Sequence, residues 1–267
     1  MQESEMPFAR GYKRFYLAEL RQPTGRLHRR RGGRVTRVLQ PGGDTWRRIR
    51  AIAWKDLTTE RRSKAGFNAV VSLGITILVL FGFALGPDAQ VLRDAAPGAL
   101  WLAVLFAGVL AFNRSYQVEL DTGALEPLLL YPGARWTIFT GKLLANMLFV
   151  GLLLVIVVLA GMVLFAVKVP EAWPTVIAVL TLGAIGLVTL GTFYASMASR
   201  SRAREVLLPL LLFPMLVPVL LAAMQASKAL IGADMMLEAG AWIKMLIAYD
   251  LIFLLATHLA FEHVIEA

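Results

Sequence analysis

The chain has 267 residues, of which 58% are hydrophobic, and its mean hydropathy is +0.65. Ordinary soluble domains contain about 45–50% apolar residues, so the composition excludes a soluble globular protein and indicates a membrane protein. The net charge of +9 comes largely from residues 1–66, which hold 17 of the 27 Lys and Arg residues; this clustering favours a cytoplasmic arm near anionic lipid headgroups over a nucleic-acid-binding protein. The absence of cysteine excludes disulfide bonds, thiolate metal sites and a cysteine nucleophile, and the three histidines are too scattered for a zinc site.

The first element in chain order is a basic stretch over residues 1–43 that is interrupted by Gly and Pro. It lacks the run of about 7–15 apolar residues that a secretory signal peptide contains. We interpret it as a flexible cytoplasmic extension, followed by a membrane domain over residues 44–267.

An amphipathic helix is predicted next, in DTWRRIRAIAWKDLTTERR, where Asp44 can cap the N-terminus. Its apolar stripe consists of Trp46, Ile49, Ala53 and Leu57. The opposite arc carries Arg47, Arg48, Ala51 and Lys55. Because a membrane span follows within about ten residues, we expect this helix to lie in the headgroup plane rather than to be an ordinary soluble amphipathic helix.

Six stretches reach or approach the length of about 20 apolar residues that crosses about 30 Å of hydrocarbon at 1.5 Å per residue. They are residues 67–86, 98–113, 143–167, 175–198, 206–226 and 241–261. The second is short, and we expect it to borrow Tyr116 and nearby residues at the inner interface. Since an unpaired backbone amide in lipid costs several kcal/mol, we predict an all-α bundle of six transmembrane helices.

The Lys and Arg residues between the spans set the orientation of the bundle. With both termini in the cytoplasm, 23 of the 27 basic residues lie on the cytoplasmic side and four on the other. This bias places the segment between the second and third spans in the cytoplasm.

That cytoplasmic segment contains LDTGALEPLLLYP, which is richer in leucine and carboxylates than an ordinary linker. Asp121 or Thr122 can cap a short helix there, and Pro127 limits the helix to one or two turns. Its apolar edge and its acids are Leu125, Leu128, Leu129, Glu119 and Glu126. We predict that this short cytoplasmic helix docks another protein; the alternative is that its leucines pack back onto the chain's own spans.

The sequence has no nucleotide-binding loop of the form GxxxxGK[ST]. The fragment WTIFTGKLL lacks the upstream glycine and has Leu143 where a hydroxyl would hold magnesium. If the protein drives transport, ATP hydrolysis must therefore come from a partner, and the segment described above is where that partner would bind.

The cytoplasmic segment reads E-x-x-T-G-A-L-E-x-L-L-L-x-P, with G-K following in the next helix. Together with the amphipathic helix and six spans, it resembles the membrane subunits of ABC-2 type transporters, in which this segment forms the coupling helix that meets the ATPase. The resemblance is closest to the haem exporter protein B (CcmB) family of cytochrome c maturation. It extends from about residue 47 to the end, in FNAVVSLGITILVLFGFALGPD, PGALWLAVLFAGVLAFNRSYQVE, LLPLLLFPMLVPVLLAA and AYDLIFLLATHLAFEHVIE.

The resemblance implies a permease subunit in the bacterial cytoplasmic (inner) membrane. Its implied partners are a CcmA-type ATP-binding subunit, a CcmC-type haem-handling membrane subunit, a small CcmD-type subunit, membrane lipids and a second permease copy in a homodimer. The implied role is to couple the partner's ATP hydrolysis to haem export or delivery, or to release of a haem-loaded chaperone, on the outer side. Haem would then be a transported or handled ligand, and we predict neither a bound cofactor nor a metal site.

Carried over by position, the ATPase-coupling role falls on Glu119, Thr122, Gly123, Leu125, Glu126 and Leu128. Two features depart from the family pattern. Pro127 stands where a small flexible residue is expected, which bears on the length of the coupling helix, and the basic residues 1–43 have no counterpart.

Polar groups and prolines inside the spans are further candidates. Asp250 lies near the centre of the sixth span, where an ionisable group costs at least about 2.5–3.5 kcal/mol. It is either a polar anchor that changes partner as the protein rearranges, or a static group that is protonated or hydrogen-bonded to Asn146, Thr189 or Tyr249. At the inner end of the second span lie Asn113 and Arg114, and Arg114 could pair with Glu119 or bind lipid phosphate.

The fifth span contains Pro209, Pro214 and Pro218. These prolines make it a hinge or the lining of a cavity, or else a helix bent only for packing. In the fourth span, Gly183, Gly186 and Gly191 permit close helix contact. His258 and His263 are five residues apart, off the spacing of one helical face, so we interpret them as interfacial or structural rather than as haem ligands.

Three classes of function remain open at this point. A permease for haem, or an ABC-2 permease for a drug, lipid or polysaccharide, fits the spans and the coupling segment. A membrane scaffold that recruits the ATPase without transport fits them as well. An intramembrane enzyme is disfavoured because Asp250 has no second catalytic group beside it in the sequence pattern, and we predict no catalytic residue.

Overall fold

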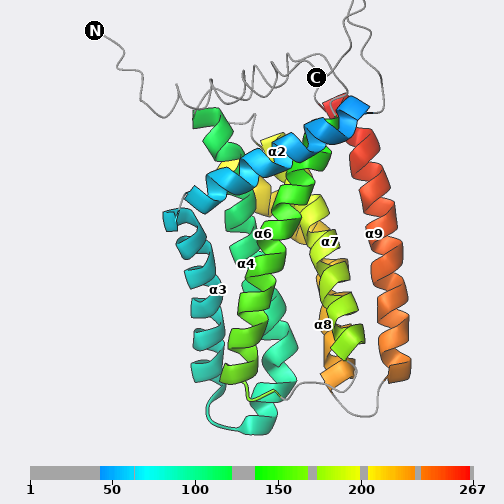
Figure 1. Cartoon of the computed structure of the whole chain (residues 1–267). Coiled ribbons are helices and arrows are strands. Elements are labelled where there is room, and N and C mark those ends of the chain that lie inside the picture. Colours follow the sequence, from blue (N-terminus) through cyan, green and yellow to red (C-terminus); the bar gives the residue numbers. More distant parts are fainter. Residues whose placement is uncertain are drawn as a thin grey trace, which may run out of the picture. The chain divides into compact units, whose positions relative to one another are not determined.

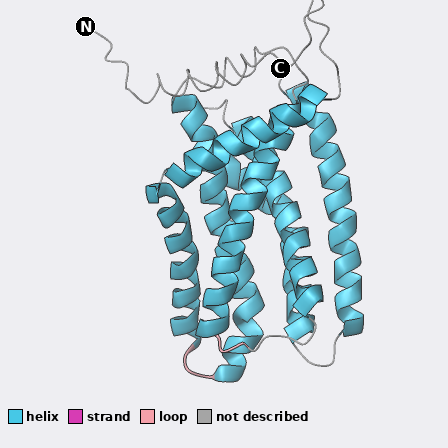
Figure 2. Cartoon of the chain, in the orientation of Figure 1, coloured by secondary structure: helices cyan, strands magenta, loops and turns pink. Residues whose placement is uncertain are grey.

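The computed structural model describes residues 43–62, 64–121, 136–167, 173–198, 204–231 and 236–264. These residues form seven helices and no strand (Figures 1 and 2). All of them belong to one compact unit, Gly42–Ala267. The predicted all-α fold is confirmed.

Six of the helices are long and apolar enough to cross a membrane, as predicted. They are α3 (Lys64–Leu85), α4 (Ala89–Asp121), α6 (Trp136–Leu164), α7 (Trp173–Ala198), α8 (Arg204–Ile231) and α9 (Met236–Val264). The helix that precedes them is α2 (Gly43–Arg62), which begins at the predicted place beside Asp44. The chain is therefore a multi-pass membrane protein. The predicted short helix between the second and third spans lies outside the described residues.

The second span differs most from its predicted bounds, because α4 has 33 residues and already begins at Ala89. Its start is capped by Asp88, whose Oδ1 accepts the backbone N–H of Gln90 at 2.8 Å. Pro97 lies inside the helix. At 1.5 Å per residue, α4 is about 50 Å long, so its polar ends extend beyond about 30 Å of hydrocarbon. The predicted bounds covered only the apolar middle of this helix, and its start was predicted too late. The predicted extension through Tyr116 is confirmed, since the membrane-length stretch runs from Ala89 to Gln117.

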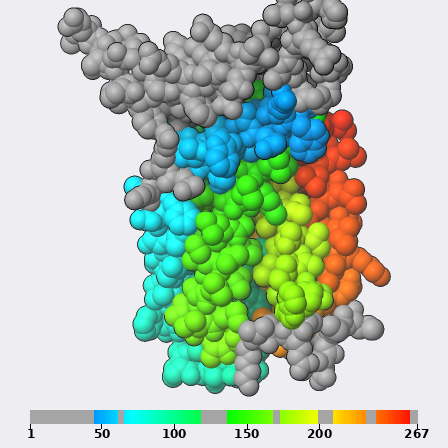
Figure 3. All heavy atoms as spheres, in the orientation of Figure 1, coloured from blue at the N-terminus to red at the C-terminus, as the bar shows by residue number. Residues whose placement is uncertain are grey.

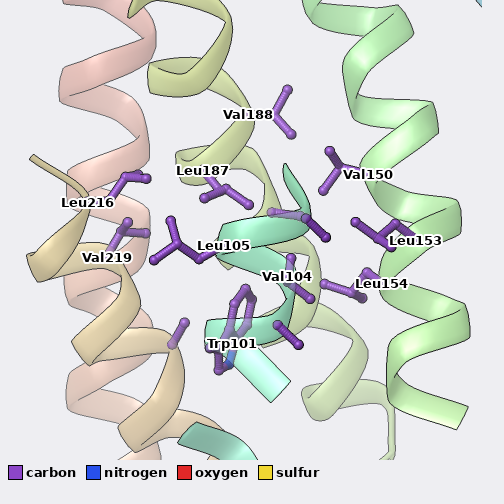
Figure 4. Close-up of a cluster of buried hydrophobic side chains, with 14 of the residues drawn as sticks. Trp101, Val104, Leu105, Val150, Leu153, Leu154, Leu187, Val188, Leu216 and Val219 are labelled. Carbon is purple, nitrogen blue, oxygen red and sulfur yellow. The ribbon is translucent and has the colours of Figure 1, made fainter. Parts of the chain in front are cut away.

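The spans pack around α4 and α7, which are the most buried of the six, whereas α3 is the least buried. Helix α4 contacts α3, α6, α7 and α8. Figure 4 shows the centre of this core, where side chains of α4, α6, α7 and α8 meet. Among its members are Trp101, Val104, Leu105, Leu153, Leu187 and Val219.

Two glycines of α7 permit the close contact with α4, as the sequence predicted. A Cβ at Gly183 would overlap the Trp101 ring, and a Cβ at Gly191 would overlap the ring of Phe112. Both rings are buried, and Trp101 Nε1 also donates a hydrogen bond to Ser227 Oγ of α8 at 3.2 Å. Small residues that let large ones approach the backbone are the usual basis of helix packing in a membrane.

The outer faces of the spans are apolar and exposed. On α6 they include Leu148, Leu152, Val155, Leu159 and Val163. In water such a stripe would need a cover, but lipid tails are as apolar as leucine. This surface is what a multi-pass membrane protein presents to the bilayer.

Candidate functional site

The residues predicted to couple to an ATPase fall mostly on a part of the chain that the structure leaves undescribed. Thr122, Gly123, Leu125, Glu126 and Leu128 all lie between α4 and α6, outside the described residues. Glu119 belongs to the last turn of α4, but its side chain is not described. What the structure does describe are the two helices that border this segment, one ending at residue 121 and the other beginning at residue 136.

Helix α2 packs against the start of α6, and Figure 3 shows its blue surface lying across the green surface of α6. Ile49 and Ile52 are buried in this contact. A Cβ placed on Gly141 of α6 would lie 2.8 Å from Cβ of Ile52 and 3.2 Å from the Ile49 carbonyl oxygen. A glycine at this position therefore sets how closely the two helices approach.

The apolar stripe predicted for α2 does not act as a single face. Ile49 is buried against α6, but Trp46 is 65% exposed. Lys55, expected on the opposite arc, is instead buried. The reason is that the ion pair of Lys55 and Asp56 lies on the packed side of α2, beside its buried isoleucines. Hydrophobic periodicity cannot predict a buried ion pair.

At the centre of this contact lies Lys142, a fully buried residue of α6. Its Nζ is 3.1 Å from Asp56 Oδ2 of α2 and donates to the backbone carbonyl of Ser115 of α4 at 3.2 Å. It also lies 4.5 Å from the centre of the Tyr116 ring. The second oxygen of Asp56 is 3.0 Å from Nζ of Lys55. We call these five residues the lysine junction; it joins three helices at one point.

The charges of the lysine junction keep Asp56 ionised. Burial by itself raises the pKa of the Asp56 carboxyl, but the ammonium groups of Lys142 and Lys55, and their hydrogen bonds, more than offset burial, so the pKa lies below its ordinary value. One turn along α2, burial raises the pKa of Glu60, against the opposing charge of Arg114. At neutral pH Asp56 is therefore a carboxylate that lies between the ammonium groups of Lys55 and Lys142.

Arg114 lies beside the junction and meets the start of α3. A Cβ at Gly66 would overlap its guanidinium, so the side chain lies directly against the α3 backbone. Its charge acts on Glu60 of α2. The predicted pairing with Glu119 concerns a side chain outside the description, and Asn113, one residue earlier, is half-buried.

The lysine junction was not predicted from the sequence. Lys142 was interpreted as one of several cytoplasmic cations, because the third span was predicted to begin at residue 143, whereas α6 begins at Trp136. The one local signal was the Gly141–Lys142 pair, where a glycine admits another helix next to a lysine. Asp56 and Ser115 lie 86 and 27 residues away from Lys142, so no spacing rule links them.

A second polar group lies within the bundle, where α7, α8 and α9 meet. Asp250 of α9 is 5% exposed, and neither carboxylate oxygen has a hydrogen-bond partner among the described residues. A Cβ at Gly186 would lie 2.8 Å from its Oδ1 and 2.6 Å from the Val219 side chain. Asp250 is therefore packed tightly against the backbone of α7.

The static hydrogen bonds considered for Asp250 are not formed among the described residues. Asn146 Nδ2 donates to Thr192 Oγ1 at 3.0 Å, and the Tyr249 hydroxyl donates to the Met215 carbonyl. Thr189 Oγ1 is buried without a partner in the described part of the chain. A polar anchor that changes partner, and a protonated acid, remain as the two interpretations.

Replacing Asp250 by leucine tests whether the carboxyl makes a stabilising bond, because leucine has nearly the same branched shape. We expect Asp250→Leu to be at least as stable as the parent, since removing a buried polar group without a partner is neutral or stabilising. Thermal unfolding in detergent micelles measures this, with Asp250→Asn as the conservative control. A fall of several degrees in the melting temperature of Asp250→Leu alone would instead show that the carboxyl makes a stabilising bond.

The three prolines of the fifth span lie within one continuous helix, α8. The carbonyl of Met215, between Pro214 and Pro218, accepts the hydroxyl of Tyr249 from α9. Proline frees carbonyl groups in the preceding turn, and a hydroxyl from a neighbouring helix can satisfy one. That hydrogen bond holds the Pro214–Pro218 stretch of α8 against α9. The role of α8 as a hinge, with Pro209 included, stays a prediction.

The histidines give no indication of a metal site in the described residues. The ring of His258 packs against Trp136, with 5.3 Å between the ring centres. No group of three or more metal-ligating side chains occurs in the part of the chain that the structure covers. The side chain of His263 is not described.

Comparison with known proteins agrees with this architecture. The family described as CcmB protein matches residues 47–267. The heme exporter protein B of Rhodobacter capsulatus is 32% identical over 174 residues, which cover 65% of this chain and 79% of that protein. The heme exporter protein B of Paracoccus denitrificans is 30% identical over 189 residues, covering 70% and 86%. The six spans, the helix α2 before them and this match over most of the length lead to one conclusion: the chain belongs to the CcmB protein family.

Proposed function

We propose that the chain is the permease subunit of an ABC transporter in cytochrome c maturation. It couples ATP hydrolysis by a CcmA-type partner to haem export or delivery, or to release of a haem-loaded chaperone, on the outer side of the bacterial cytoplasmic membrane. The match to the CcmB family over residues 47–267 carries this proposal. Relatives named heme exporter protein B from two bacteria support haem as the ligand that is moved or handled.

The sequence supports separate roles for this chain and its ATPase partner. No GxxxxGK[ST] motif is present, so the nucleotide is bound by the partner. The segment between α4 and α6 carries the coupling residues, from Glu119 to Leu128, and receives the partner's movement. The excess of basic residues supports a cytoplasmic location for both termini and for this segment, where ATP is available.

The further partners follow from the same family membership. A CcmC-type haem-handling subunit and a small CcmD-type subunit complete the assembly in the membrane. Two copies of the permease form a homodimer, which gives each ATPase of a pair its own coupling segment.

Reversing the charge at Glu126 tests the proposal. We expect Glu126→Lys to weaken co-purification with the CcmA-type ATPase by at least about tenfold, since a misplaced like charge at an interface costs several kcal/mol and 1.4 kcal/mol is tenfold. ATP hydrolysis by the purified complex should fall with it. The measurement is the ATPase recovered per permease, together with the rate of phosphate release.

Glu171→Lys is the matched control, because it makes the same charge change between α6 and α7, at the other end of α6. It should leave assembly and hydrolysis at the parent level. Unchanged assembly and turnover in Glu126→Lys would count against docking at this segment.

A further inference from the structure

The lysine junction touches both borders of the segment that receives the ATPase. Ser115 and Tyr116 lie five to six residues before α4 ends, and Lys142 lies six residues after α6 begins. Six residues are about 9 Å of helix. The third helix of the junction is α2, which contributes Asp56 and precedes both α4 and α6 in the sequence.

Packing alone does not explain a lysine at this position. Lys142 is fully buried, and lysine is almost never fully buried unless it is paired. Replacing a buried ion pair by apolar residues of similar volume is often neutral for stability. A methionine at position 142 would fill the same space without a buried charge, and Asp56 would still have Lys55 at 3.0 Å. The ammonium group adds a geometric requirement, because it must contact a carboxylate on α2 and a carbonyl on α4 at the same time. Buried ionic groups are best known for fixing the register between helices.

The surrounding contacts extend this fixed register along α2. Near its first half, Ile52 and the Ile49 carbonyl close over Gly141. Near its second half, Glu60 lies within the field of Arg114, whose side chain lies on Gly66 at the start of α3. Helix α2 is thus held to α6 at one end and reaches α3 at the other.

We propose that Lys142 and Asp56 are positioning residues that fasten α2 to the two helices bordering residues 122–135. A push on that segment then moves the end of α4, the start of α6 and α2 as one rigid frame, and α2 passes the movement to α3. This rests on the proposed function and deepens it, because it adds a third helix, remote in sequence from the coupling segment, to the path of the movement.

The experiment uses the complex with the CcmA-type ATPase and a disulfide that replaces the ionic link. The chain has no cysteine, so an introduced pair is specific within it. Ile52→Cys with Gly141→Cys places two thiols where α2 meets α6. A Cβ added at Gly141 would lie 2.8 Å from Cβ of Ile52, and a modest outward shift reaches the 3.5–4.5 Å of a disulfide. The readouts are ATP hydrolysis, co-purification and melting temperature, each measured oxidised and after dithiothreitol.

We expect Lys142→Met to assemble with the ATPase and to melt within a few degrees of the parent, but to hydrolyse ATP at least about fivefold more slowly, the lower end of ordinary coupling energies. Adding the cysteine pair to Lys142→Met should restore hydrolysis when oxidised and lose it again when reduced. In the Lys142 parent, the oxidised pair should leave hydrolysis unchanged, because α2 and α6 do not move against each other.

Three results would overturn the inference. They are ATP hydrolysis at the parent rate in Lys142→Met, loss of hydrolysis in the Lys142 parent when the cysteine pair is oxidised, and failure of the pair to form a disulfide. The first result would show that Lys142 has no positioning role. The second would show that α2 moves against α6 during turnover, and the third that Ile52 and Gly141 are not in contact. A parent complex without any ATP hydrolysis would instead remove the proposed function, and this inference with it.

Discussion

Asp56→Leu is expected to destabilise the folded chain by about 3–5 kcal/mol, the usual effect of breaking a buried ion pair from one side. The carboxylate of Asp56 lies between the ammonium groups of Lys142 and Lys55, which are both buried. Without it, two like charges face each other in a site from which water is excluded. The measurement is the free energy of unfolding of the detergent-solubilised chain in a titration with a denaturing detergent.

The two partners of this ion pair, Asp56 and Lys142, are expected to differ in the effect of their removal. Lys142→Met should cost far less, because Asp56 keeps Lys55 at 3.0 Å and methionine fills the space of the lysine stem. The double variant Asp56→Leu with Lys142→Met should recover most of the loss, since it removes the charge that the carboxylate balanced. Equal losses from the two single variants would contradict this description of the junction.

The effect of pH follows from the lowered pKa of Asp56. A carboxyl whose pKa is lower in the folded state stabilises the fold above the pKa of the unfolded chain, and this contribution is lost as pH falls through the folded value. Unfolded Asp titrates near about 3.9. The difference between parent and Asp56→Leu should therefore stay constant from about pH 8 to pH 5 and shrink only below about pH 4.

Gly191→Ala is expected to destabilise the bundle by about 1–3 kcal/mol, the ordinary cost of overpacking a core. The added methyl would overlap the ring of Phe112, which is fully buried on α4. In a membrane the loss has few compensations, because packing between helices supplies much of their association. The same unfolding titration measures it.

Gly151→Ala is the matched control, since it adds the same methyl to a spanning helix where no atom lies within 4 Å. It should be neutral, or stabilise by up to about 1 kcal/mol through helix propensity. Combining Gly191→Ala with Phe112→Leu should recover part of the loss, because the smaller side chain makes room. A Gly191→Ala variant as stable as Gly151→Ala would mean that α4 and α7 do not approach as closely as described.

Much of the fold could be predicted from the sequence, because crossing lipid imposes a simple requirement. Continuous apolar stretches must be helices, so hydropathy located all six spans and the break between α4 and α6. The ends of the spans were predicted poorly. Arg93, Asp94 and Pro97 interrupt the apolar pattern, yet α4 continues through them because its ends lie beyond the hydrocarbon.

The polar contacts could not be predicted, because they depend on which residues distant in sequence meet. Lys142 and Asp56 each look like an ordinary interfacial charge, and only the packing of α2 on α6 brings them together. Asp250 was recognised from its place in the sixth span, but its lack of a hydrogen bond among the described residues depends on where Asn146 and Tyr249 direct their own donors. The predicted coupling residues of the 122–135 segment lie outside the described residues, so their role stays a proposal.

The most direct test of the account is crosslinking from the coupling segment in the assembled complex. A photoreactive amino acid in place of Leu128, on the apolar edge predicted to face the partner, would be activated in membranes that contain the CcmA-type ATPase. We expect a crosslink to the ATPase, and no such product from the same group at Val163, which is exposed at the far end of α6. Crosslinks from Leu128 that reach only lipid, or only this chain's own spans, would contradict it.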